Sequence, residues 1–122
     1  MREGKDIALL ATGPILGRTL AAADTLAARG ISASVVSLPT FTPLDLDCLR
    51  AVANTHRAIL TVEEHGASGG FGSRVADVLM EAGLHPRFGK YGITDALRGQ
   101  VGSQNWLLDQ MVSIEDRAVA LL

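Results

Sequence analysis

The richest set of reactive side chains in this 122-residue chain lies between Glu63 and Gly72. The segment reads Glu-Glu-His-Gly-Ala-Ser-Gly-Gly-Phe-Gly, so two carboxylates and one imidazole precede a run of glycines. Because histidine exchanges protons near neutral pH, His65 is the candidate acid or base of this segment. A surface or interface histidine that is hydrogen-bonded to a neighbouring carboxylate is an equally good interpretation.

The glycines of the same segment indicate a second kind of chemistry, the binding of an anion. Glycine lets a backbone approach a ligand closely, and the free N–H groups at the start of a helix attract negative charge. Gly70-Phe71-Gly72 has the spacing that opens a dinucleotide fingerprint, but Val75 stands at the third glycine position, and two carboxylates would repel a phosphate. A phosphate or nucleotide cradle at Gly66 to Gly72 is therefore kept as an alternative.

Two further interpretations of this segment need no ligand. The glycines can shape a sharp connection between a strand and a helix, or the segment can lie against another chain or domain. Phe71 favours the second interpretation, because we expect an aromatic ring set among glycines to be exposed to a partner. The contact candidates are Glu64, His65, Gly69, Gly70, Phe71 and Gly72.

The rest of the chain offers little reactive chemistry. Cys48 lies beside leucines in a helical pattern, which favours an inert, buried thiol. The three histidines and the single cysteine lack the spacing of a metal site, and no Gly-x-Ser-x-Gly elbow supplies a serine nucleophile. We therefore assign no catalytic, cofactor-binding or metal-binding residue from the residue pattern alone.

Apolar runs and helical spacings alternate along the chain, and these elements must position the segment. We predict strands at residues 7–11, 32–38, 58–62 and 87–93, with helices between them and at 107–111 and 114–122. Gly30 and Gly83 mark helix ends, while Thr42 and Pro43 mark a helix start. This order predicts a mostly parallel sheet with helices on both faces. The segments that follow the strands then meet at one sheet edge, where ligands usually bind.

The composition limits the class of protein. The 122 residues, 48% of them hydrophobic, suffice for one buried core, so we expect a single domain over residues 1–122. The net charge of −2 gives no basic excess for nucleic acid, and no apolar run is long enough to cross a membrane. A single cysteine cannot form an internal disulfide and favours a reducing, cytoplasmic location.

Several segments taken together resemble the C-terminal domain of the transketolase family. They follow the family's order: a charged lead-in with an apolar strand and a Thr-Gly turn, a Pro-Leu-Asp turn, a Val-Glu-Glu-His stretch with a glycine run, and a last strand. In this chain they are Arg2 to Gly13, Val35 to Asp45, Thr61 to Ser73 and Gly89 to Asp95.

The resemblance implies a three-layer α/β/α domain whose mixed sheet of about five strands is mostly parallel, with one antiparallel strand. It also implies that the parent enzyme uses thiamine diphosphate and magnesium, which other domains bind. The Gly-Asp-Gly sequence that holds the metal diphosphate is absent from this chain. We therefore expect an assembly or dimerisation domain, a homodimer that joins the thiamine-binding domains or subunit and is inactive by itself. The resemblance further implies that His65 could contact substrate at the active-site entrance.

Overall fold

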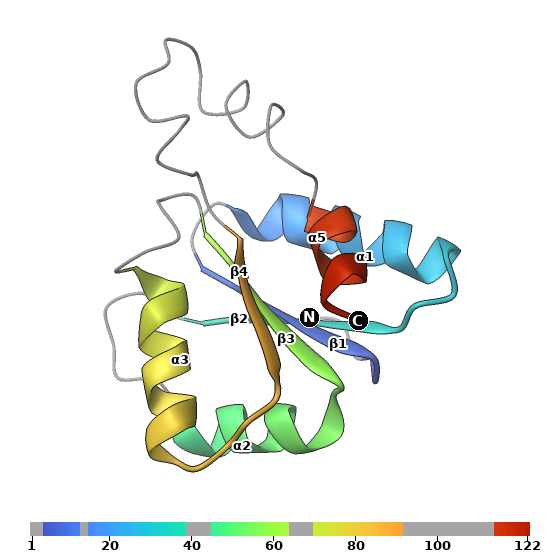
Figure 1. Ribbon diagram of the computed structural model, residues 1–122. Helices are drawn as coiled ribbons and strands as arrows, with labels where there is room; N and C mark the ends of the chain where they lie inside the picture. Colours follow the sequence, from blue (N-terminus) through green and yellow to red (C-terminus); the bar gives the residue numbers. More distant parts are fainter. Residues whose placement is uncertain (1–3, 13–14, 39–44, 64–69, 92–113) are drawn as a thin grey trace, which may run out of the picture.

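Strands and helices alternate along the chain, as the sequence predicts (Figure 1). The computed structural model describes residues 4–12, 15–38, 45–63, 70–91 and 114–122. The elements within them are β1 (Ile7–Ala11), α1 (Leu16–Ala28), β2 (Ala33–Ser37), α2 (Leu46–Thr55), β3 (Ala58–Val62), α3 (Phe71–Glu81), β4 (Arg87–Tyr91) and α5 (Ile114–Leu121).

The four described strands form one parallel sheet in the order β2-β1-β3-β4. Their ends are flush, because Ala11 lies beside both Ser37 and Val62, and Val62 lies beside Tyr91. The predicted parallel α/β sheet is confirmed. It has four strands where about five were expected, and the antiparallel strand that the resemblance implies is not among the described residues.

The helices form two layers around the sheet, which confirms the three-layer arrangement (Figure 1). One face of the sheet is covered by α1 and α5, whose core residues include Leu26 and Ala118. The other face is covered by α2 and α3, whose core residues include Leu49 and Val75. Every residue of β1 and β3 is buried, because these two strands have a neighbouring strand on both sides and helices on both faces.

Helix α5 packs closely on the edge strand β4 because residue 89 is a glycine. A Cβ atom at Gly89 would lie 3.0 Å from Nη2 of Arg117 and 3.3 Å from Cδ2 of Leu121. Arg87, also on β4, donates a hydrogen bond of 2.7 Å to the carbonyl oxygen of Leu122. The C-terminal end of the described chain is therefore fastened to the sheet.

The helix ends test the predictions made from turn residues. Gly30 and Gly83 have φ angles of 79° and 74°, the left-handed conformation expected just after a helix. The prediction of a helix start at Thr42 and Pro43 is wrong, because α2 begins at Leu46. Asp45 has extended backbone and its carboxylate accepts a hydrogen bond of 3.1 Å from the Cys48 N–H, so it is the N-cap.

Among the described residues, no helix has both the length and the apolar character that crossing a membrane requires.

The lead-in to β1 is fixed by hydrogen bonds to the neighbouring strand. Ser34 Oγ accepts a hydrogen bond of 2.7 Å from the Gly4 N–H and donates one of 3.1 Å to the Gly4 carbonyl oxygen. His56, at the end of α2, places Nε2 2.7 Å from the same Ser34 hydroxyl. A Cβ atom on Gly4 would lie 2.5 Å from the backbone of Ala33, so only glycine fits there.

Replacing Gly4 with alanine is therefore expected to lower the free energy of unfolding by about 1–3 kcal/mol, because the clash is with backbone that cannot swing away. Urea unfolding followed by circular dichroism measures the change. Gly17→Ala is the matched control: nothing lies within 4 Å of a Cβ atom at this position in α1, and it should raise stability by roughly 0.5–1 kcal/mol. Equal effects of the two substitutions would contradict this account of the lead-in.

Candidate active site at the end of β3

Glu63 immediately follows β3 and continues its direction. Its N–H donates a hydrogen bond of 3.0 Å to the carbonyl oxygen of Tyr91, the last residue of β4. Since side chains alternate along a strand, Glu63 points to the same face of the sheet as Thr61, towards α3. Its side chain is only 5% exposed.

The Glu63 carboxylate binds the start of α3. Its Oε2 accepts a hydrogen bond of 2.7 Å from the N–H of Phe71, the first residue of the helix. The first N–H groups of a helix have no partner within the helix and carry partial positive charge, so a carboxylate here is favourable. Glu63 thus occupies the place at which the sequence suggested a bound phosphate.

Two glycines allow the strand and helix to come this close. A Cβ atom at Gly70 would lie 2.8 Å from Oε1 of Glu63. A Cβ atom at Gly72 would lie 2.5 Å from Oγ1 of Thr61, a buried hydroxyl that has no hydrogen-bond partner among the described residues. The interpretation in which these glycines shape a sharp strand-to-helix connection therefore accounts for both of them.

The expectation that Phe71 is exposed is wrong. Phe71 is 3% exposed and packs in the core with Leu10, Val75 and Leu79. The physical reason is that α3 begins at Phe71 itself, so residues 71, 75 and 79 lie on one helical face that points to the sheet. This i, i+4, i+8 spacing was present in the sequence and could have revealed the buried ring.

A further polar contact links β4 to the first turn of α3. Lys90 Nζ donates a hydrogen bond of 3.2 Å to Oγ of Ser73. The described part of the sheet edge therefore contains a carboxylate, an ammonium group and hydroxyls that contact neighbouring protein atoms. Sequence reasoning missed the roles of Glu63 and Lys90, because each depends on which strands lie side by side.

Three of the contact candidates lie outside the described residues: Glu64, His65 and Gly69. The contact and substrate roles given to them stay predictions. The His56 ring is hydrogen-bonded, since its Nδ1 lies 2.9 Å from the carbonyl oxygen of Val52. The Cys48 thiol has a raised pKa, first because of burial and second because of the Asp45 charge, so it stays protonated at neutral pH.

The described residues do not fit a thiamine diphosphate site. They include no group of three or more histidine, cysteine, aspartate or glutamate residues that could hold a metal ion. The start of α3, which could otherwise attract a diphosphate, is bound by Glu63 at its first N–H. No step of cofactor chemistry can be assigned to these side chains.

Residues 1–113 match the protein family described as "Transketolase, C-terminal domain". The chain belongs to this family. The match confirms the resemblance seen in the sequence, and the parallel sheet between two helical layers agrees with it.

The curated relatives are longer proteins, and this chain aligns with only a part of each. The 1-deoxy-D-xylulose-5-phosphate synthase of Desulfitobacterium hafniense is 43% identical over 84 residues, which cover 69% of this chain and 13% of that protein. The same enzyme from Lysinibacillus sphaericus is 36% identical over 121 residues, 98% of this chain and 19% of that protein. A 6-deoxy-6-sulfo-D-fructose transketolase subunit from Clostridium is 36% identical, over 84% of this chain and 34% of that subunit. The chain thus spans at most about a third of these relatives.

Two solved structures also contain a region that matches nearly the whole of this chain. A split-gene transketolase described as an inactive beta4 tetramer aligns over 98% of this chain and 39% of its own, with a TM-score of 0.82 and 35% identity. A 2-oxoglutarate:ferredoxin oxidoreductase from Magnetococcus marinus, with 17% identity and a TM-score of 0.62, shares the fold.

Replacing Glu63 with glutamine should lower the free energy of unfolding by about 1–3 kcal/mol, because the charge at the start of α3 is lost and a buried amide lacks partners for its own N–H groups. Hydrogen exchange at the Phe71 amide should become faster in parallel. Both are measurable on the isolated chain by urea unfolding and NMR.

Glu81→Gln is the control for this experiment. Glu81 is an exposed glutamate in the last turn of the same helix, where a negative charge does not help the helix dipole. Its replacement should leave both unfolding and Phe71 exchange unchanged. If the two substitutions behaved alike, the proposed contact between Glu63 and Phe71 would not stabilise the fold.

Proposed function

We propose that this chain is the C-terminal assembly domain of a thiamine-diphosphate-dependent enzyme of the transketolase family, and that it catalyses no reaction by itself. The observation that carries the proposal is the family match over residues 1–113 together with a sheet edge whose anion-binding position is taken by Glu63. The domain supplies a folded surface, and thiamine diphosphate with magnesium binds in the other sections of the enzyme. We treat residues 1–122 as one such domain, in a cytoplasmic enzyme.

The names of the relatives support a narrower proposal for the parent enzyme. Deoxyxylulose-phosphate synthases and a sulfofructose transketolase subunit both act on phosphorylated or sulfonated sugars, as their names indicate. We propose that the parent enzyme transfers a two-carbon or acyl fragment to or from such a sugar. Thiamine diphosphate, when bound, would supply the chemistry of the fragment transfer, and we assign no role in it to the described residues of this chain.

The proposed partners are the thiamine-binding section of the same enzyme and a second copy of the chain. By thiamine-binding section we mean the rest of the enzyme, whether it is joined to this chain or encoded as a separate subunit. The split-gene relative, whose beta chains form an inactive tetramer, supports both self-association and the lack of activity without the other subunit.

The competing function is a free-standing module that binds a phosphorylated small molecule or nucleotide at Gly66 to Gly72. The hydrogen bond from Phe71 to Glu63 and the tight packing of Gly70 speak against it, because an incoming phosphate would have to displace a buried carboxylate. The family match also favours the assembly domain.

Calorimetric titration tests the proposal. The isolated chain should release no heat of binding with thiamine diphosphate and magnesium, with phosphosugars or with nucleotides at micromolar concentrations. A mixture of the chain with the thiamine-binding section should bind the cofactor and should form a defined complex in analytical ultracentrifugation.

Two results would contradict the proposed function. One is micromolar binding of thiamine diphosphate or a phosphosugar by the chain alone. The other is a thiamine-binding section that neither associates with the chain nor changes its activity or oligomeric state when the chain is added.

A further inference from the structure

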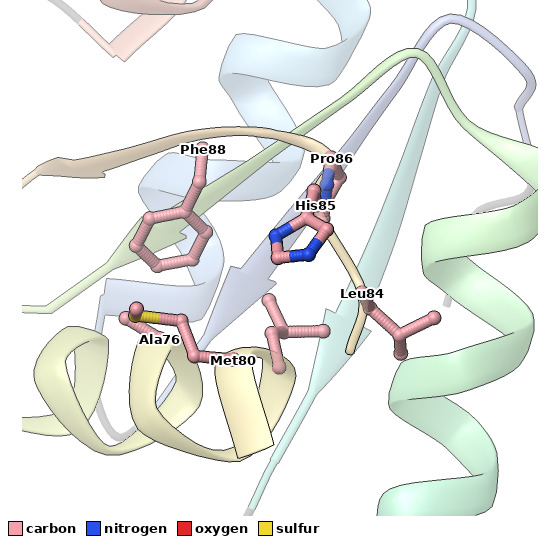
Figure 2. A pocket seen from close by; sticks show the side chains of 7 residues that line it. Ala76, Met80, Leu84, His85, Pro86 and Phe88 are labelled. Atoms are coloured by element: carbon pink, nitrogen blue, oxygen red, sulfur yellow. The ribbon is translucent and has the colours of Figure 1, made fainter. Parts of the chain in front are cut away.

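An apolar groove lies beside the strand β4, on the layer that contains α2 and α3. Figure 2 shows the Phe88 ring of β4 opposite Ala76 and Met80 of α3, with His85 and Pro86 beside it on the connecting segment. Leu79 and Leu84 complete the lining. The groove is separate from the Glu63 contact, because it lies at the start of β4 and the far end of α3.

The groove is large enough to receive a side chain of another protein. Its volume is about 280 Å³, whereas roughly 150 Å³ already accommodates a benzene ring. Met80 is 70% exposed, the highest value among the large apolar side chains that the structure describes as exposed. A flexible thioether at the rim of an apolar groove is typical of surfaces that adapt to a partner.

The charged side chains that flank Met80 in the sequence are acidic and exposed. Asp77 and Glu81 stand three residues before and one residue after Met80, are exposed, and make no ion pair with any residue in the described part of the chain. Arg87, the cation next to Phe88 in the sequence, donates its hydrogen bond to the Leu122 carbonyl oxygen and pairs with neither acidic residue among the described contacts. A partner with a cationic side chain next to an apolar one would complement this surface.

We propose that this groove receives a segment of the thiamine-binding section that presents a large apolar side chain beside a lysine or arginine. The inference rests on the proposed function and assigns it a surface. A second copy of the chain fits less well, because a two-fold contact at this groove would set the acidic rims of the two copies against each other. The rest of the enzyme could supply such a segment, since the aligned part makes up only 13% to 34% of these relatives.

The experiment measures the dissociation constant between the chain and the thiamine-binding section by calorimetry. Met80→Asp should raise it about tenfold or more, since a charge would enter the apolar contact. The pair Asp77→Lys and Glu81→Lys should weaken binding to a similar extent and remove its dependence on salt. Leu20→Asp is the matched control, because Leu20 is 36% exposed on α1, across the sheet from the groove, and should change the constant less than about twofold.

The outcomes separate the two proposals. If the unaltered chain does not bind the thiamine-binding section, the proposed function fails. If it binds, and Met80→Asp binds equally well or loses no more than Leu20→Asp, only the groove inference is overturned. Self-association of the chain that Met80→Asp abolishes would also overturn it, by making a second copy the occupant. Thermal unfolding of the Met80, Asp77 and Glu81 variants should be unchanged, because these side chains are exposed.

Discussion

The contact between the Glu63 carboxylate and the Phe71 amide organises this end of the molecule. It joins the residue that follows β3 to the first residue of α3 across eight positions of the chain, at 2.7 Å. A buried carboxylate needs such a partner, and a helix start needs an acceptor, so Oε2 of Glu63 and the N–H of Phe71 satisfy each other. The closely packed glycines on either side of Phe71 follow from this contact, because a side chain at either position would push α3 off the sheet.

The same contact speaks against an anion cradle in the described part of this glycine-rich segment. The helix dipole that would attract a phosphate already faces a carboxylate from within the chain. Among the described residues, Glu63, Lys90 and Ser73 form hydrogen bonds within the domain at this edge, whereas the most exposed large apolar side chain, Met80, lies at the groove. This arrangement supports the proposed role as an assembly domain.

The central strands were predictable from the sequence to the residue, because 7–11 and 58–62 are apolar runs that are buried on both faces. The edge strand β2 is one residue shorter at each end than the predicted 32–38, because only one neighbouring strand stabilises it among the described residues, while the end of the predicted strand 87–93 lies outside the described residues. The glycines around Phe71 favoured an exposed loop there, although the helical spacing of Phe71, Val75 and Leu79 indicated that α3 begins at Phe71. The roles of Glu63 and of the Met80 groove arise from elements that meet only in the folded chain, so local patterns could not supply them.

Glu63 itself fills the anion position at the start of α3, so we expect the isolated domain to bind no cofactor there. The Phe71 amide resonance reports on that position directly. The isolated chain is titrated with inorganic phosphate, and then with thiamine diphosphate and magnesium. Because Glu63 already binds the Phe71 amide, we expect this resonance not to move. A saturable shift of the Phe71 amide at micromolar ligand would contradict it.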